Sequence, residues 1–353
     1  MLTCQRARWL WSVVFLFLPY VMVLPLAAEE QVFIAHGAQN EMNGPLWMAV
    51  EKGSFKKYGL DVRMLQVRSG AVSIAALASG SLKIVWTHPS SALSAVSGGM
   101  KMSCIASSSN KITRELVVRR GIGSLEDLRG KVFGVQSIGG GFWLQTMTML
   151  ESLGIDPDKY RLALRVVGDT AVVAQALMSE NIDAAVLPYS FAEQAKRAGF
   201  RSLADSADLK TPYQGNCICA LRDAIANSPD LMTNLIKGVI EGIAMVQDPN
   251  TKQQVMDVLK KNLRLTKAED VEASYKVLRL MTTMDVAPNP EAWRTIQKIV
   301  ARVNGKVAQV DLDQVLNGSF VQRLEKTGFL TEARQRAAHR MLRPLCAVLL
   351  IVR

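Results

Sequence analysis

Four short polar segments of this sequence combine residue types that can bind a small anionic or acceptor-rich molecule. Each follows an apolar, strand-like run and precedes a helical pattern, at residues 39–43, 87–91, 137–142 and 188–190. Backbone N–H groups at the start of a helix lack an intrahelical partner and carry partial positive charge, so they attract anions and hydrogen-bond acceptors. The candidate binding residues are Asn40, Asn43, Thr87, His88, Ser90, Ser137, Gly139, Gly140, Gly141, Phe142 and Tyr189.

Each of these residues also has a purely structural interpretation. The glycines at residues 139–141 form either a tight turn or a loop that a ligand approaches closely. Hydroxyls at a helix start serve as N-caps as well as ligand contacts. His88 beside Pro89 is more typical of a turn than of a catalyst, because no carboxylate or nucleophile lies near it in sequence. Trp86 and Tyr189 form either the wall of a core or a stacking surface.

No catalytic or metal-binding motif is evident. The chain has three histidines and no Cys/His cluster at ligand spacing, so we expect no metal site. A P-loop, paired carboxylates and a Ser–His–Asp spacing are also missing, so we expect no cofactor and no enzyme activity. The members of a catalytic triad can be far apart in sequence, which keeps an enzyme as the rival class. Because the four segments contain no arginine, we expect helix ends and hydroxyls to bind the anion.

The chain alternates short apolar strand-like runs with helical patterns over most of its length. This alternation predicts an α/β fold in which mainly parallel sheets are covered by helices on both faces. Ligands of such sheets bind at the carboxyl ends of the strands, which is where the four polar segments stand. From residue 228 onward the pattern is helical, so we expect a helical C-terminal region.

The alternation restarts midway, which indicates two lobes. We expect residues 29–118 to form the first part of lobe one, residues 119–213 to form lobe two, and residues 214–332 to return to lobe one with the helical region. Residues 76–86 resemble residues 176–186, so each lobe has a helix followed by a strand that delivers a loop to the same edge of its sheet. Two chain crossings, near residues 118 and 214, would make a hinge.

A longer motif resembles a known family. Residues 49–62, AVEKGSFKKYGLDV, are similar to the A-x-E-K-G-x-F-K-K-x-G-L-D-V signature of nitrate/sulfonate/taurine-type solute-binding proteins, the periplasmic receptors of ABC importers. Lys83 departs from the usual aspartate of the family, which Asp183 keeps. Further similar segments follow in the expected order, and the resemblance extends over most of the chain, at residues 76–80, 124–131 and 176–179 within residues 31–330.

The resemblance implies a two-lobed periplasmic binding protein of type II, with the four polar segments lining a cleft between the lobes. It further implies capture of a small organic or anionic solute, such as a sulfonate, nitrate or taurine, and delivery to an ABC permease in the inner membrane. Thiamine-pyrimidine synthases also resemble this family, although their cysteine-rich run is absent here. A solute-sensing ectodomain for a signalling partner and a pyrimidine-precursor enzyme of the same fold are the alternatives.

The two ends of the chain differ from its body. The formal net charge is +11, and residues 1–28 and 333–353 contain arginines but no acidic residue. Since the body has no cluster of Lys and Arg, we expect no nucleic-acid partner, and we expect a monomer. Residues 1–28 have a charged start, an apolar run and Ala28 before two acidic residues, which predicts a cleaved secretory signal and a periplasmic location. An uncleaved membrane anchor is the alternative.

The cysteines and the C-terminal segment allow more than one interpretation. Cys217 and Cys219 lie two apart on one strand and are too constrained to pair with each other. In an oxidising compartment Cys104 can pair with either, while burial as free thiols is the alternative. Residues 333–353 lie beyond the family resemblance, so we expect a dispensable basic and apolar tail, with a docked terminal helix as the alternative.

Overall fold

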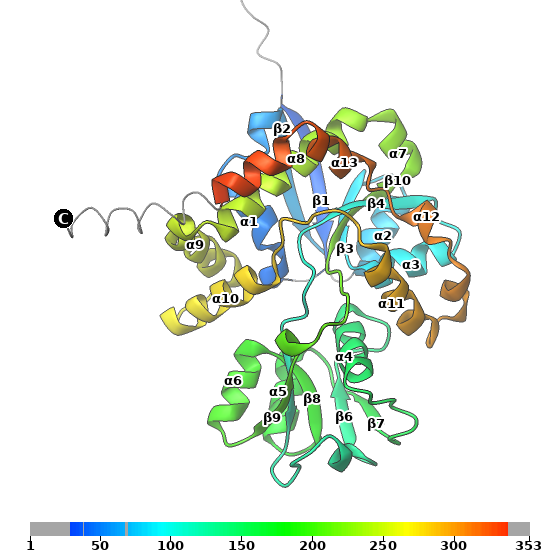
Figure 1. The fold of residues 1–353 in the computed structure, drawn as a ribbon, viewed down its shortest axis with the longest axis vertical. Helices are drawn as coiled ribbons and strands as arrows, with labels where there is room; N and C mark the ends of the chain where they lie inside the picture. The colour runs from blue at the N-terminus through cyan, green and yellow to red at the C-terminus, as the bar shows by residue number, and fades with distance from the viewer. Residues whose placement is uncertain (1–28, 38, 68–69, 338–353) are drawn as a thin grey trace, which may run out of the picture.

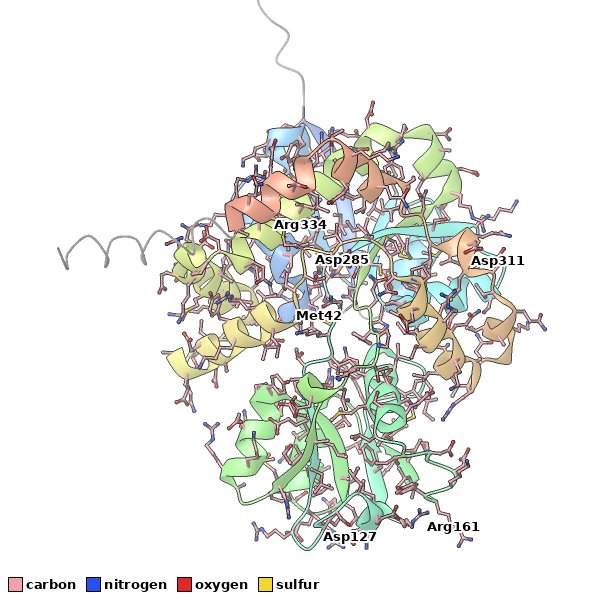
Figure 2. The ribbon with its side chains drawn as sticks, in the orientation of Figure 1. Met42, Asp127, Arg161, Asp285, Asp311 and Arg334 are labelled. Carbon is pink, nitrogen blue, oxygen red and sulfur yellow. A yellow bond between two sulfur atoms is a disulfide. The ribbon has the colours of Figure 1, made fainter. Side chains whose placement is uncertain are left out.

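The computed structural model describes residues 29–37, 39–67 and 70–337; the predicted signal at residues 1–28 and the chain beyond residue 337 lie outside this part. Two lobes stand one above the other in Figure 1, each built on one five-stranded sheet flanked by helices. The upper lobe contains both ends of the described chain, and the lower, green lobe contains its middle; Figure 2 labels Arg334 in the upper lobe and Asp127 in the lower one. The predicted fold class, a two-lobed α/β protein with mainly parallel sheets, is confirmed.

The sheet of lobe one has the strand order β2-β1-β3-β10-β4. Four strands run parallel, and β10 runs antiparallel to both β3 and β4. The inner strand β3 and the edge strand β4 are both buried along their whole length, as expected for a sheet covered on both faces. The strands are β1 (Glu30–His36), β2 (Leu60–Gln66), β3 (Ile84–Thr87), β4 (Met102–Ser107) and β10 (Cys217–Leu221).

The sheet of lobe two has the order β7-β6-β8-β5-β9, which repeats the plan of lobe one. Here β5 is the strand that runs antiparallel to its neighbours, β8 and β9. The strands are β5 (Arg114–Val118), β6 (Val132–Val135), β7 (Ala163–Val166), β8 (Ala184–Pro188) and β9 (Arg201–Asp205). Its helices are α4 (Gly141–Ser152), α5 (Thr170–Met178) and α6 (Tyr189–Arg197).

The chain crosses into lobe two earlier than the sequence suggested. The prediction placed residues 114–118 in lobe one, whereas β5 pairs with β8 and β9 and is therefore part of the second sheet. The first crossing thus lies between β4 and β5, and the second lies between β9 and β10. Both crossings lead directly into the antiparallel strand of the lobe that they enter.

Helices cover both faces of the sheet in lobe one. One face packs against α1, α8 and α13, and the other packs against α2, α3, α11 and α12. Helix α8 crosses α1 so closely that a Cβ atom at Gly242 would lie 2.1 Å from the carbonyl oxygen of Pro45. The helices of this lobe are α1 (Gly44–Glu51), α2 (Gly70–Ala78), α3 (Pro89–Ser97), α7 (Arg222–Asn227), α8 (Pro229–Gln247), α9 (Lys252–Leu263), α10 (Ala268–Met281), α11 (Pro290–Ala301), α12 (Leu312–Val315) and α13 (Ser319–Lys326).

A last helical stretch, residues 329–337, packs on lobe one after α13. Ala333 is fully buried. Arg336 pairs with Glu241 at 3.2 Å, and Arg334 with Glu325 at 2.7 Å. The predicted start of the tail at residue 333 is therefore too early, because residues 333–337 belong to the packed lobe.

A disulfide joins Cys104 and Cys219. The two residues stand opposite each other on β4 and β10, so the register of the sheet selects Cys219 from the two partners that the sequence allowed. Cys217 is a buried free cysteine whose pKa is raised to about 12 by burial. The bond ties the strand that precedes the first crossing to the strand that follows the second. Within the described ranges, no helix is both long and apolar enough to span a membrane.

Candidate functional site

The carboxyl edges of the two sheets face each other where the lobes meet (Figure 1). Parallel strands of each lobe end at this edge, and the antiparallel strands β5 and β10 begin there. We call this region the interlobe junction: the ends of β3, β6 and β8, the starts of β5 and β10, and the loops attached to them. The connections after β1, β3, β6 and β8, where the four polar segments lie, all leave their sheets at these edges.

The first polar segment makes local contacts in lobe one. The side chain of Asn40 caps a short 3₁₀ helix by accepting a hydrogen bond from the backbone N–H of Met42 at 3.1 Å. Asn43 is fully buried, and its Nδ2 donates to Nδ1 of His36 at 3.2 Å. This segment therefore shapes the start of α1 beside the junction.

The second polar segment brings His88 to the centre of the junction. His88 is the N-cap of α3, which begins at Pro89, because proline suits the first turn of a helix. Its Nδ1 lies 3.2 Å from Oγ of Ser90, and its Nε2 lies 2.8 Å from the hydroxyl of Tyr213, on the second crossing. Burial of the ring lowers the pKa of His88 to about 3, and Arg114 lowers it further in the same direction, so the imidazole is neutral at physiological pH.

Thr87 and Ser90 are both buried beside His88. The hydroxyl of Thr87 has no hydrogen-bond partner among the described residues. A buried hydroxyl without a partner costs free energy, so this atom is a natural contact for a polar ligand group.

The glycine segment lets lobe two approach His88. A Cβ atom at Gly141 would lie 3.4 Å from the imidazole ring of His88, and one at Gly140 would lie 2.7 Å from Oγ of Ser137. Gly139 has a φ of +79°, a conformation that favours glycine. The segment is therefore a tight turn that lobe one approaches closely, and close approach of a ligand stays a prediction. Ser137 itself is exposed at the rim.

Phe142 leads to an arginine that the sequence analysis did not select. The guanidinium carbon of Arg114 lies 4.0 Å from the centre of the Phe142 ring, within range of a cation–π interaction. Arg114 is only 5% exposed. Its Nε donates to Oε1 of Gln145, and Nε2 of Gln145 donates to the hydroxyl of Tyr213 at 2.8 Å. Arg114, Gln145 and Tyr213 thus extend the contacts of His88 into lobe two.

The charge of Arg114 is poorly compensated by the protein. Burial lowers its pKa to about 9, although Tyr213 and Glu41 act in the opposite direction. Within the described part of the chain, no carboxylate forms an ion pair with this guanidinium at 4.0 Å or less. Its terminal amino groups likewise make no hydrogen bond to the residues described. Arg114 lies outside the four polar segments, so a search of those segments alone does not find it.

Tyr189 lies at the junction but serves as a wall. Its ring packs against Met42, Val277 and Met281 of lobe one, and its hydroxyl donates to Asp205. Burial and this carboxylate raise the pKa of Tyr189. Trp86, which the sequence analysis considered as a stacking surface or a core wall, is buried in a hydrophobic core, as is Trp143 of α4.

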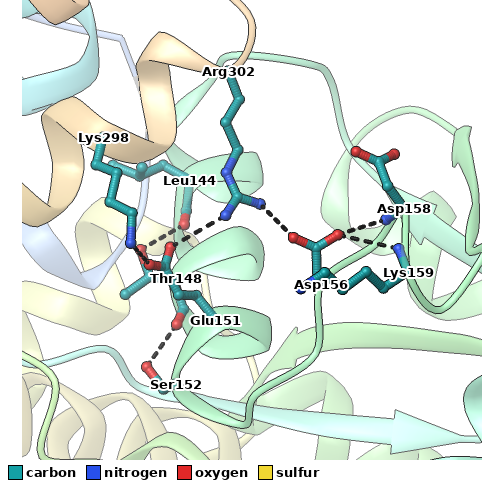
Figure 3. A network of polar contacts seen from close by, with 9 residues as sticks. All are labelled: Leu144, Thr148, Glu151, Ser152, Asp156, Asp158, Lys159, Lys298 and Arg302. Carbon is teal, nitrogen blue, oxygen red and sulfur yellow. Dashed lines mark hydrogen bonds and ion pairs between the residues drawn. The ribbon is translucent and has the colours of Figure 1, made fainter.

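Ion pairs join the lobes on another side of the junction, as Figure 3 shows. Lys298 on α11 lies 2.7 Å from Glu151 on α4, and Arg302 lies 3.9 Å from both Glu151 and Asp156. Backbone N–H groups of the following loop donate to Asp156 and lower its pKa. We call these four residues the interlobe ion-pair cluster. The lobes therefore touch through charge at α4 and α11 and through apolar contact at Tyr189.

The described residues also form a cavity of about 230 Å³ elsewhere, on lobe one between the end of α1 and β2. Its lining includes Phe55, Leu60 and Arg63 and none of the residues of the junction. Buried hydrogen-bonding groups from several elements converge at the junction, whereas this cavity lies on one edge of one lobe, so we take the junction as the candidate site. No group of three or more His, Cys, Asp or Glu that could bind a metal occurs in the described ranges.

The sequence matches the family described as NMT1/THI5 like over residues 40–252. This match covers more than half of the chain. The chain belongs to the NMT1/THI5-like family. The matched region contains the whole of lobe two, both crossings and every residue of the junction named above except His36, Val277, Met281, Lys298 and Arg302.

Known proteins resemble this NMT1/THI5-like chain in sequence and in fold. A protein of Brucella abortus (strain 2308), named as a binding protein, is 27% identical over 242 residues, which are 68% of this chain and 73% of that protein. The periplasmic aliphatic sulphonate binding protein SsuA from Escherichia coli has a TM-score of 0.64 at 20% identity, covering 81% of this chain and 97% of that one. The periplasmic nitrate-binding protein NrtA from Synechocystis PCC 6803 has a TM-score of 0.55 at 14% identity, with coverages of 83% and 92%. The predicted resemblance to this group is confirmed.

Proposed function

We propose that this NMT1/THI5-like protein is the solute receptor of an ABC importer and closes its two lobes on a small anion at the interlobe junction. The proposal agrees with the names of its structural neighbours, which include sulphonate-binding and nitrate-binding proteins. It names a binding protein without catalytic activity, a permease in the inner membrane as the partner, and a monomer as the working form. The solute is a small organic or inorganic anion.

Arg114 is the observation that carries the proposal. A buried charge is costly unless it is paired, and removal of one partner from a buried pair is strongly destabilising. Arg114 retains a guanidinium at 5% exposure with one neutral amide, Gln145, as its side-chain hydrogen-bond partner and one aromatic ring, Phe142, against it. An oxyanion is the partner that this arrangement lacks, because a guanidinium binds carboxylate-like groups with two parallel hydrogen bonds.

Further groups suit the remaining part of such a solute. The buried hydroxyl of Thr87 lies on the lobe-one side of the junction, while the N-terminus of α4 lies on the side of lobe two. Backbone N–H groups at this helix start add to the positive potential around Arg114. We therefore propose Thr87, Ser90, Arg114, the glycines at residues 139–141 and Phe142 as the solute contacts. Asn40, Asn43, Ser137 and Tyr189 would then shape the rim and the wall.

The disulfide supports an exported protein. Disulfides form and persist in oxidising compartments and are rare in the cytosol. The Cys104–Cys219 bond therefore agrees with a secretory signal at residues 1–28 and with a periplasmic location. Amino-terminal sequencing of the protein from a periplasmic fraction tests both. A mature protein that still begins at Met1 and sediments with membranes would contradict them.

Calorimetric titration with a panel of sulfonates, carboxylates and nitrate tests the solute class. Saturation at one hundred times the dissociation constant raises the free energy of unfolding by about 2.7 kcal/mol, so a thermal-shift assay serves as the first screen. We expect Arg114→Met to weaken binding of the anion found in this screen by at least about tenfold, because a charge-assisted hydrogen bond is lost. The same variant should melt at an equal or higher temperature without the anion, since replacing a buried charge with an apolar side chain is often neutral or stabilising.

Arg119→Gln is the matched control. Arg119 stands at the other end of β5, where it pairs with Asp183 of the neighbouring strand. The Arg119→Gln variant should leave anion binding unchanged. Equal affinity of the Arg114→Met variant and the wild-type protein would refute the proposed site. Conversion of the bound compound to a product would instead favour an enzyme.

A further inference from the structure

Five side chains form one continuous chain of hydrogen bonds across the junction, with Arg114 at one end and Ser90 at the other. It runs through Gln145 of lobe two and Tyr213 of the second crossing to His88 of lobe one. The direction of each hydrogen bond follows from chemistry, even though two of the contacts permit either atom as the donor. This chain of hydrogen bonds therefore has a single consistent polarity.

Arg114 sets the polarity at one end. A guanidinium only donates, so the atom of Gln145 that faces Nε of Arg114 is the carbonyl oxygen. The amide group of Gln145 then faces Tyr213 and donates to its hydroxyl oxygen at 2.8 Å. The proton of that hydroxyl has to find another acceptor, because Tyr213 is only 2% exposed.

His88 offers that acceptor. Its Nε2 lies 2.8 Å from the Tyr213 hydroxyl, so Nε2 accepts and the ring proton resides on Nδ1. Nδ1 then donates to Oγ of Ser90 at 3.2 Å. The opposite tautomer would let Nδ1 accept from the backbone N–H of Ser90 at 3.4 Å, but it would leave the buried Tyr213 proton without an acceptor. The Nδ1···Oγ contact fits either tautomer, because the Ser90 hydroxyl can donate as well as accept, so the buried Tyr213 hydroxyl is what favours the Nδ1–H form.

With this polarity, two hydrogen-bond acceptors at the junction are already occupied and do not contact a solute. The carbonyl oxygen of Gln145 is bound to Arg114, and Nε2 of His88 is bound to Tyr213. The terminal amino groups of Arg114, which are donors only, remain for the solute. A solute group that carries its own proton meets only donors at Arg114, and burial of its unpaired proton there would cost free energy.

We infer that Gln145 and Tyr213 are positioning residues that orient Arg114 and fix the tautomer of His88, so that the junction selects an anion that only accepts hydrogen bonds. The inference deepens the proposed function and rests on it for the location of the solute. It separates two anions of similar size and equal charge: an alkylsulfonate, which has no proton, and the monoanion of an alkylphosphonate, which has one.

The tautomer test needs no solute. Nitrogen-15 NMR of the full-length protein with labelled histidine distinguishes Nδ1–H from Nε2–H, and replacement of each histidine in turn assigns the signals. We expect the Nδ1–H form for His88 and the Nε2–H form for His36, whose Nδ1 accepts from Asn43. Tyr213→Phe removes the donor to Nε2, so His88 should change to the Nε2–H form. Gln145→Glu provides a second test, because the new carboxylate would attract the Tyr213 proton away from His88.

Tyr58→Phe is the control, since the Tyr58 hydroxyl donates to Glu241 far from the junction. It should leave the tautomer of His88 unchanged. An Nε2–H form of His88 in the wild-type protein would overturn the inference. An Nδ1–H form that persists in both the Tyr213→Phe and Gln145→Glu variants would also overturn it.

Binding of ethanesulfonate and ethylphosphonate by calorimetry tests the selectivity. At about pH 6 the phosphonate retains one proton, and we expect it to bind about tenfold or more weakly than the sulfonate. Tyr213→Phe should reduce this ratio, whereas Tyr58→Phe should preserve it. Equal affinities in the wild-type protein would overturn the inference while sustaining the proposed function. If neither anion binds, the proposed solute class fails for these probes, and the NMR result still decides whether the chain has the stated polarity.

Discussion

The interlobe ion-pair cluster predicts that lobe closure depends on ionic strength. Glu151 is the residue to change, because its carboxylate contacts both Lys298, at 2.7 Å, and Arg302, at 3.9 Å. The side chain of Lys298 is 70% exposed and that of Glu151 is 29% exposed, so solvent screens each pair. Exposed pairs contribute about 0.2–1 kcal/mol each, so Glu151→Gln should cost closure roughly 1 kcal/mol in total.

A free energy of about 1 kcal/mol corresponds to about a fivefold change in the ratio of closed to open molecules. Small-angle X-ray scattering of the full-length protein, or energy transfer between one label on each lobe, measures this ratio at low salt. Affinity for the solute should fall by a similar factor, because only the closed form contacts it from both lobes. In about 1 M salt the Debye length shrinks to about 3 Å, and the wild-type protein should approach the variant.

Glu325→Gln is the matched control for this prediction. Glu325 pairs with Arg334 at 2.7 Å and both side chains are partly exposed, at 45% and 41%, but both residues belong to lobe one. Glu151→Gln should not lower the melting temperature, since a carboxylate near the C-terminus of α4 opposes the helix dipole. A closed fraction unchanged by Glu151→Gln at low salt, or an equal loss with Glu325→Gln, would refute the reasoning.

Three further outcomes are expected. Replacing both Cys104 and Cys219 by alanine should lower the free energy of unfolding, measured in urea, by up to about 5 kcal/mol, because the bond closes a long loop of 115 residues. Equal stability of this variant and the oxidised wild-type protein would contradict this role of the bond. The lowered pKa of His88 means that the unfolded chain binds a proton more readily than the folded protein. The free energy of unfolding should therefore fall as the pH drops from about 6.5 toward about 3, by up to about 1.4 kcal/mol per pH unit. His88→Asn should show a shallower slope in thermal unfolding followed against pH, and equal slopes would contradict the assignment. Truncation after Glu332 should lower the melting temperature, since it removes the buried Ala333, whereas truncation after residue 337 retains that packing and serves as the control.

The fold could be predicted because its signals are local and repeated. Residues 49–62 form the end of α1, a short 3₁₀ helix and the start of β2. Prolines at helix starts, such as Pro45 and Pro89, mark where α1 and α3 begin. β5 was assigned to the wrong lobe because its sequence shows that it is a strand but not which strands it pairs with. That information lies in β8 and β9, which come much later in the chain.

The site could be predicted only in part, for a geometric reason. Searching the carboxyl ends of parallel strands finds Thr87 and the glycines that precede α4. Arg114 stands at the amino end of a strand, and that end reaches the junction only because β5 runs antiparallel to β8. Tyr213 likewise precedes the antiparallel strand β10. A search for site residues in a mainly parallel sheet should therefore also include the residues at the start of its antiparallel strands.

The position of β10 has a consequence for the order in which the protein forms. Lobe two is continuous in the chain, and all five of its strands lie between Arg114 and Asp205. The sheet of lobe one instead needs β10 between β3 and β4, so its centre stays incomplete until residue 221 has been synthesised. During synthesis from the amino terminus, lobe two can therefore fold before β10 is available to complete the sheet formed by the first four strands of lobe one. The lobe whose synthesis begins first is therefore completed last. Cys104 can pair with Cys219 only after the whole of lobe two has formed between them.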